Sequence, residues 1–142
     1  MAVDVALAML RRDGRWLMQL RADTPGIVAP GCWGLFGGHL DPGETPEQGL
    51  RRELREEISW EPPSLEPVMV RPIHHRIAHV FLGELTVPPE RLRLLEGQDL
   101  VLVSPEELVA GAIRSPRLAT HRPVADGLRE LMRDAISLSE PR

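Results

Sequence analysis

The sequence predicts an α/β domain built around a mixed β-sheet. The predicted strands outnumber the helices and do not alternate with them in regular β–α–β units, which argues against a purely parallel sheet. One strong amphipathic helix lies near the middle of the chain. A length of 142 residues, with 42% hydrophobic and 27% charged residues, is typical of one globular domain. We therefore expect a single domain spanning residues 1–142.

The first strands surround a long loop. Residues 3–10 and 16–20 are apolar, and the Asp-Gly pair between them favours a tight hairpin turn. Residues 22–34 are rich in proline and glycine and are expected to form a loop. Residues 35–40 then read as a short strand that contains two adjacent glycines.

The clearest helix is predicted over residues 46–58. Thr45 supplies an N-cap, Pro46 occupies the first helical position, and Gln48 completes a capping box. Apolar side chains recur at i, i+4 and i+8 and form the expected buried stripe. These residues are Leu50, Leu54 and Ile58.

Strands and two further helices are predicted after the central helix. Residues 65–73, 77–87 and 100–103 read as strands. The Ser-Pro-Glu-Glu sequence at residues 104–107 carries a capping signal for a short helix. A C-terminal amphipathic helix is expected to begin near Pro123. This order of elements gives the mixed sheet named above.

Composition excludes several classes of function. The net charge is −4 and no basic tract is present, so we expect no nucleic-acid binding. No run of about 18 apolar residues is present, and the start of the chain carries no secretion signal, so we expect no membrane span and a cytoplasmic location. The single cysteine, Cys32, allows no intrachain disulfide and fits a reducing compartment.

Three carboxylates share one side of the central helix. Glu53, Glu56 and Glu57 stand at i, i+3 and i+4, beside the apolar stripe. Like charges this close repel one another, and a hard divalent cation such as Mg²⁺ or Mn²⁺ would offset the repulsion. Arginines are interleaved with these glutamates, so the helix alone favours a solvated face with surface ion pairs over a metal site.

The glycine-containing loop before the helix favours the metal interpretation. Residues 38–60, GHLDPGETPEQGLRRELREEISW, resemble the Nudix box. The residues that match it at the required spacing are Gly38, Glu44, Arg52, Glu53, Leu54, Glu56 and Glu57. Two positions depart from the pattern: Ser59 stands where the family has a glycine, at a helix end where a positive φ is expected, and Trp60 replaces an aliphatic residue.

The resemblance implies a fold, an activity and a metal site. The fold is the family's α/β/α sandwich with a mixed sheet, and the activity is hydrolysis of a diphosphate linkage by water attacking phosphorus. The implied metal ligands are the carbonyl of Gly37 and the carboxylates of Glu53, Glu56 and Glu57, with Mg²⁺ or Mn²⁺ as the cofactor. Arg52 is expected to orient Glu53 through a salt bridge, and Glu44 to hold the loop.

Further site residues follow from a narrower resemblance. The Glu96-Gly97-Gln98 segment is similar to one in the mutator-type 8-oxo-dGTP pyrophosphohydrolases, whose glutamate approaches the metals. The general base is therefore either Glu53 or Glu96, and Glu96 is otherwise a solvent-exposed loop carboxylate. Three more residues are candidates for substrate binding, each with an ordinary surface or core role as the alternative. They are Arg21 and His39 for phosphate and Trp33 for stacking on a base.

The substrate is expected to be a small nucleotide containing a diphosphate. A nucleoside triphosphate, an oxidised one included, a nucleotide sugar and a dinucleoside polyphosphate all remain open, because loops outside the box read the substrate in this family. A non-catalytic module that senses or binds a nucleotide on the same fold is the alternative. The C-terminal helix could cover the sheet or form a homodimer contact.

Overall fold

The computed structural model describes residues 3–140. The strands are β1 (Val3–Arg12), β2 (Arg15–Leu20), β3 (Trp33–Gly34), β4 (Phe36–His39), β5 (Glu66–Ile73), β6 (Arg76–Glu84), β7 (Asp99–Val103), β8 (Ala112–Ser115) and β9 (Thr120–Pro123). The helices are α1 (Pro46–Ile58), α2 (Pro105–Ala110) and α3 (Leu128–Ser139), with a short 3-10 turn at Pro89–Arg91.

Seven of the strands form one sheet. Its main path runs β3-β2-β1-β6-β5, while β4 pairs with β1 and β7 pairs with β2. Strands β1 and β6 are parallel, and every other pair in this sheet is antiparallel. The prediction of a mixed sheet is therefore confirmed. Strands β8 and β9 form a separate hairpin.

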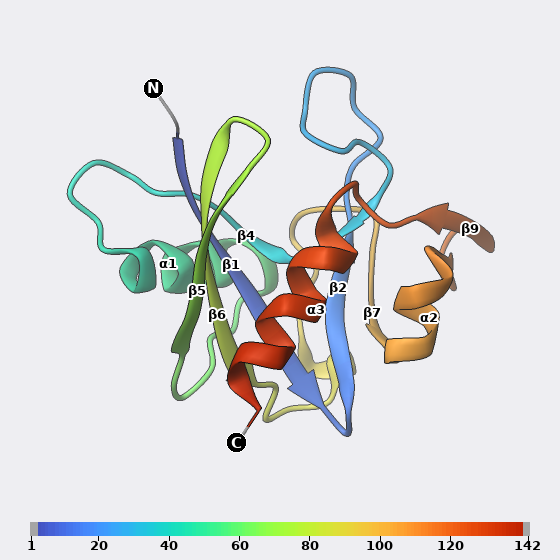
Figure 1. Cartoon of the computed structure of the whole chain (residues 1–142). Coiled ribbons are helices and arrows are strands. Elements are labelled where there is room, and N and C mark those ends of the chain that lie inside the picture. The colour runs from blue at the N-terminus through green and yellow to red at the C-terminus, as the bar shows by residue number, and fades with distance from the viewer. Residues whose placement is uncertain (1–2, 141–142) are drawn as a thin grey trace.

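Helices α1 and α3 cover opposite faces of the sheet (Figure 1). The apolar stripe of α1 packs in one core with alternate side chains of the strands, including Ala8 and Phe81. Leu131 and Met132 of α3 pack in the other core, with Met9 among others. Because side chains alternate along a strand, the same strands supply both cores. This arrangement is the expected α/β/α sandwich.

Helix α1 has the bounds that the sequence predicts. The hydroxyl of Thr45 accepts a hydrogen bond from the N–H of Gln48, and the Gln48 side chain accepts one from the N–H of Thr45. The helix ends at Ser59, whose φ of 55° and ψ of 35° are left-handed. The expectation of a positive φ at this position is confirmed, although serine replaces the glycine that adopts it most easily.

Three element boundaries differ from prediction. The C-terminal helix begins at Leu128 rather than near Pro123, because Val124 bridges to Trp33 and Gly127 has a φ of 79°, which interrupts any helix there. The hairpin of β8 and β9 was not predicted. The strand expected over residues 35–40 is β4, which pairs with β1, whereas β3, which pairs with β2, lies within the segment 22–34 that was expected to be a loop.

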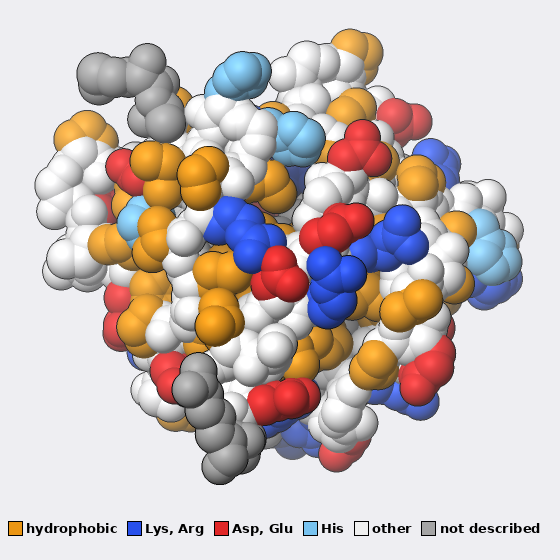
Figure 2. Space-filling model, viewed as in Figure 1, with side chains coloured by type: hydrophobic (Ala, Val, Ile, Leu, Met, Phe, Trp, Pro, Cys, Tyr) orange, Lys and Arg blue, Asp and Glu red, His pale blue; other side chains and the backbone are white. Residues whose placement is uncertain are grey.

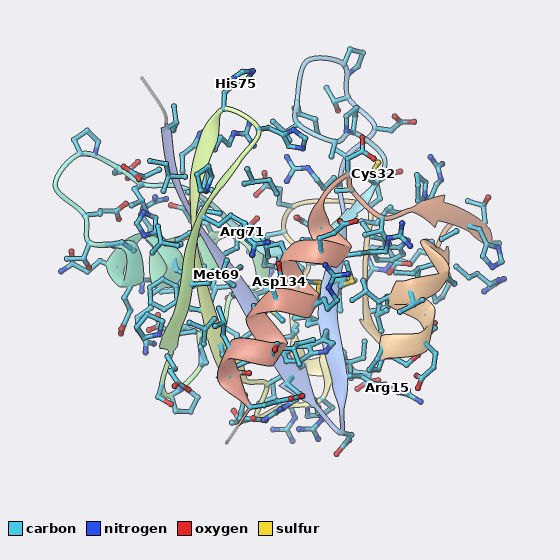
Figure 3. All side chains as sticks on the ribbon, in the orientation of Figure 1. Arg15, Cys32, Met69, Arg71, His75 and Asp134 are labelled. Atoms are coloured by element: carbon cyan, nitrogen blue, oxygen red, sulfur yellow. The ribbon has the colours of Figure 1, made fainter. Side chains whose placement is uncertain are left out.

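An ion pair ties α3 to the edge strand of the sheet. Arg71 of β5 and Asp134 of α3 point toward one another in Figure 3, with 2.6 Å between Nη2 and Oδ2. Acidic and basic side chains are interspersed over this face, as Figure 2 shows, so no charge of one sign dominates it. Within residues 3–140, no helix is long and apolar enough to cross a membrane.

Candidate active site

A cleft opens where β1 and β2 diverge. These strands pair only at Arg11↔Trp16 and Arg12↔Arg15, after which β4 joins β1 and β3 joins β2. The cleft has a volume of about 720 Å³, which is within the range of small-molecule sites. Much of its lining is apolar. It comes from strands of the sheet such as β1 and β5, from the loop of residues 26–32 and from the start of α3. These residues include Val5, Leu7, Leu35, Ile73, Val124 and Leu128.

Two glycines of β4 allow the carboxylates of α1 to reach the cleft. Gly37 has a φ of 140°, and a Cβ atom on it would lie 2.0 Å from the carbonyl oxygen of Ala6. A Cβ atom on Gly38 would lie 2.8 Å from the carboxyl carbon of Glu53. Real Cβ atoms do not approach so closely, so any side chain at Gly38 would displace the carboxylate of Glu53. The absence of a side chain at Gly38 thus leaves room for the Glu53 carboxylate beside β4.

Three carboxyl groups gather at this end of the cleft. Glu57 is only 3% exposed, and its Oε1 accepts a hydrogen bond of 2.9 Å from the N–H of Gly37. Burial, together with repulsion from Glu96 and Glu53, raises the pKa of Glu57 to about 9, although the Gly37 hydrogen bond opposes the shift. Burial likewise raises the pKa of Glu53, against the opposing hydrogen bond and charge of Arg52, and repulsion from Glu56 and Glu96 adds to the rise. The negative charge of the cluster is therefore only partly compensated.

The structure separates Glu56 from the other two helix glutamates. Glu53, Glu57 and Glu96 line the cleft, whereas the Glu56 side chain is 58% exposed and pairs with Arg52 at 3.2 Å. Among residues 3–140, no three His, Cys, Asp or Glu side chains are oriented as a ready-made metal-binding group. The helical arc places all three glutamates on one side of α1, but only Glu53 and Glu57 line the cleft.

Arg52 connects the loop before α1 to the carboxylate cluster. Its guanidinium donates to both carboxylate oxygens of Glu44, at 2.8 and 3.0 Å, and to Oε1 of Glu53 at 3.1 Å. It also donates to the carbonyl oxygen of His39. Glu44 in turn accepts a hydrogen bond from the N–H of Asp41, and these bonds lower the pKa of Glu44. Arg52 thus contacts Glu53, as the sequence predicts, but its strongest partner is Glu44.

Of the three predicted substrate-binding residues, the structure brings two to the cleft. Arg21 and His39 line it, and Nε of Arg21 donates to the carbonyl oxygen of Val28. The expectation for Trp33 is wrong. Its side chain is fully buried in the core, and its indole N–H donates to the carbonyl oxygen of Ile113 at 2.9 Å, so the ring has no face free for a base.

Sequence reasoning missed other residues of the cleft. Arg76, at the start of β6, lines it, and so does Asp126, which precedes α3. Asp126 lies near Cys32, since its charge raises the pKa of that thiol, an effect second to burial. Figure 3 places Cys32 beside the segment that leads into α3. Only the three-dimensional proximity of these segments could identify them, because no motif links them in sequence.

Comparison with known proteins gives a consistent picture. A model of the NUDIX domain matches residues 1–125. The nucleoside triphosphatase NudI of Escherichia coli is 43% identical over 54 residues. That match covers 38% of this chain and 38% of NudI, so the likeness spans well under half of the relative's length.

Solved structures share the fold over nearly the whole chain. The MutT NUDIX hydrolase of Burkholderia pseudomallei is 22% identical, with a TM-score of 0.73 and 99% of each chain covered. The NUDIX domain of Shewanella oneidensis NrtR, solved with ADP ribose, is 18% identical, with a TM-score of 0.71. That comparison covers 96% of this chain and 88% of the other. At these sequence identities the likeness establishes a shared fold and nothing further.

Proposed function

This chain belongs to the NUDIX family, and we propose that it is a metal-dependent hydrolase that cleaves a diphosphate linkage in a nucleotide. One observation carries the proposal: the carboxyl groups of Glu53, Glu57 and Glu96 converge at one end of a cleft that also has a large apolar surface. Such a cleft suits a ligand with an anionic end that binds through cations and a flat apolar end that is removed from water.

The lining of the cleft supports a proposed place for each part of the substrate. The nucleoside lies over the apolar floor formed by Val5, Leu35 and Leu128, where burial of a base is favourable. The phosphates lie toward the carboxylate end. Arg21 is positioned to contact them, because guanidinium groups bind phosphate oxygens in a bidentate manner. His39, when protonated, adds a second positive charge beside the phosphates.

The residues at the carboxylate end fit a divalent cation, which we propose to be Mg²⁺ or Mn²⁺. The raised pKa values of Glu53 and Glu57 record burial and mutual repulsion that a bound cation would offset, and carboxylate oxygens are the ligands that these ions prefer. Glu53 and Glu57 would hold the ion with Glu96 and the Gly37 carbonyl, and Glu56 would join after releasing Arg52. When bound, the ion neutralises diphosphate charge and acidifies a water molecule.

The reaction that we propose is a displacement at phosphorus. A water oxygen forms a bond to one phosphorus while the bond from that phosphorus to the bridging oxygen breaks, and the bridging oxygen leaves with the other phosphate. A carboxylate accepts the proton that the water loses. Glu53 and Glu96 both line the cleft, so either can serve as this base. Arg52 holds Glu53 in position through the bond to its Oε1.

A substrate panel tests the proposal. Purified protein with Mg²⁺ is incubated with nucleoside di- and triphosphates, nucleotide sugars and dinucleoside polyphosphates, and released phosphate products are measured. We expect turnover of at least one class, and loss of turnover in the Glu53→Gln variant. Binding of these nucleotides without turnover of any would instead favour the non-catalytic binding module. Absence of both binding and turnover would exclude either role.

A further inference from the structure

We propose that Gln19 is a positioning residue that fixes Glu96 against Glu57 and thereby sets the metal affinity of the cleft. Gln19 belongs to β2 and is separated from both glutamates in sequence. The side-chain amide of Gln19 donates a hydrogen bond of 2.9 Å to the carbonyl oxygen of Glu96. This inference rests on the proposed function in one respect, which is that Glu96 contributes to the cation site.

Gln19 is an unusual residue for its position. It is 3% exposed, and its neighbours Met18 and Leu20 are fully buried apolar residues. A buried amide loses its bonds to water, so it is tolerated where it finds protein partners and destabilises the fold where it does not. The partner found here is the backbone of the loop that carries a cleft carboxylate. This buried polar residue therefore directs its side-chain hydrogen bond to the loop that carries Glu96.

The loop lies directly against the strand at this point. Gly97 has a φ of 97°, and a Cβ atom on it would lie 2.8 Å from the carbonyl oxygen of Leu20 and 2.9 Å from Nε2 of Gln19. Glycine is thus required both by the backbone conformation and by the close approach. This contact leaves the peptide of Glu96 little room to move away from β2.

Three further hydrogen bonds fasten the same loop at both ends. The N–H of Leu95 donates to the carbonyl oxygen of Glu57 at 2.8 Å, which joins the loop to the end of α1. The N–H of Gln98 donates to the carbonyl oxygen of Leu20, and the Gln98 side chain donates to that of Arg21. The loop therefore bridges α1 and β2, and Gln19 binds it at Glu96, whose side chain lines the cleft with Glu57.

The consequence is a fixed position for Glu96 at the carboxylate cluster. Glu96 lines the cleft with Glu53 and Glu57, and these groups repel one another when they are ionised. The backbone bond to Gln19 holds the peptide of Glu96 beside the cluster before a metal binds. Without it, the loop can turn Glu96 toward solvent, and a metal ion must then restore the arrangement at the expense of its binding free energy.

The Gln19→Met variant tests the inference, because methionine keeps the length of the side chain and removes the amide. Mn²⁺ binding to the substrate-free protein is measured by electron paramagnetic resonance, and kcat and KM are measured on any substrate found. We expect the Mn²⁺ dissociation constant to rise at least about tenfold, as for residues that orient metal ligands. We also expect kcat to fall about as much, with KM within about twofold of wild type.

Gln48→Met is the matched control. Gln48 is exposed, and its side chain accepts one hydrogen bond in the capping box of α1, away from the cleft. It should lower stability without changing Mn²⁺ affinity. Gly97→Ala provides a second route to the same loop if Gln19→Met does not fold, and it should weaken Mn²⁺ binding in the same way.

The results separate the inference from the proposed function. Wild-type Mn²⁺ affinity in a folded Gln19→Met protein, or in folded Gly97→Ala when Gln19→Met is unfolded, overturns the role of Gln19. So does an equal loss in Gln48→Met, which would reflect stability alone. If the wild-type protein turns over no substrate, the proposed function fails, and the Mn²⁺ measurements still decide the role of Gln19.

Discussion

Replacing Glu57 with glutamine should stabilise the metal-free protein at alkaline pH while it weakens metal binding. Glu57 is 3% exposed and its pKa is raised from 4.5 to about 9, chiefly by burial. Glutamine keeps the shape and the acceptor for the Gly37 N–H but carries no charge at any pH. The change therefore removes the unfavourable ionisation and little else.

The sign follows from linkage between protonation and folding. Because the folded pKa lies above the unfolded one, the contribution of Glu57 to stability is complete below 4.5 and is lost as pH rises through about 9. Each pKa unit corresponds to about 1.4 kcal/mol. From about pH 5 to about pH 8 the wild-type protein should thus lose up to about 4 kcal/mol that Glu57→Gln retains.

Urea denaturation in the presence of a chelator, repeated across that pH range, measures the difference. Other titrating groups are common to both proteins and cancel. Glu61→Gln is the control, since ion pairs with Arg55 and Arg51 lower the pKa of Glu61 against a smaller effect of burial. A lowered pKa affects the pH dependence of stability only below about 4.5, so this variant should be destabilised by a constant amount from about pH 5 to about pH 8. Parallel pH–stability curves for wild type and Glu57→Gln would refute the reasoning. Added Mg²⁺ should stabilise wild type more than the variant.

Three other changes test separate parts of the site. Arg52→Lys loses the paired bonds to Glu44 and should lower kcat about tenfold or more. Arg55→Lys, on the exposed side of α1, is the control and should leave kcat unchanged. Equal kcat values in the two variants would contradict the role of Arg52. Trp33→Phe leaves the Ile113 carbonyl without its donor, so urea denaturation should show a free energy of unfolding that is lower by about 1 to 3 kcal/mol. A higher KM with unchanged stability would instead indicate that Trp33 binds the substrate. Gly38→Ala places a methyl group against Glu53 and should weaken Mn²⁺ binding about tenfold in a titration; unchanged affinity would mean that Glu53 can move aside freely.

Local signals made α1 predictable to the residue. Its N-cap, its capping box and its apolar stripe all lie within a few positions of one another, and they point to the same bounds that the structure shows. The start of α3 depends instead on the bridge between Val124 and Trp33, two residues far apart in sequence. A helical periodicity that begins at Val124 cannot reveal that this residue is held by a strand.

The residues of the candidate site were likewise predictable only where local sequence determines their position. Helical spacing places Glu53 and Glu57 together, and a motif in sequence pointed to Glu96. The sequence could not show that Glu56 pairs with Arg52 instead of lining the cleft, because helical spacing does not fix which of these side chains the tertiary packing directs to the cleft. Trp33 was misassigned because a tryptophan beside a glycine-rich loop has the same sequence signature in a core as in a binding site. Gln19 carried a usable signal as the one polar residue in the apolar run 16–20.

The position of the carboxylates along α1 has an electrostatic consequence for the helix itself. Glu56 and Glu57 occupy the last turn, where the aligned peptide dipoles place partial negative charge and acidic residues are unfavourable. Two carbonyl groups of that turn are satisfied by the N–H groups of Arg93 and Leu95, which limits the unfavourable field. A divalent cation at this end would interact favourably with both the carboxylates and the dipole. Ion binding should therefore slow amide hydrogen exchange in the last turn of α1.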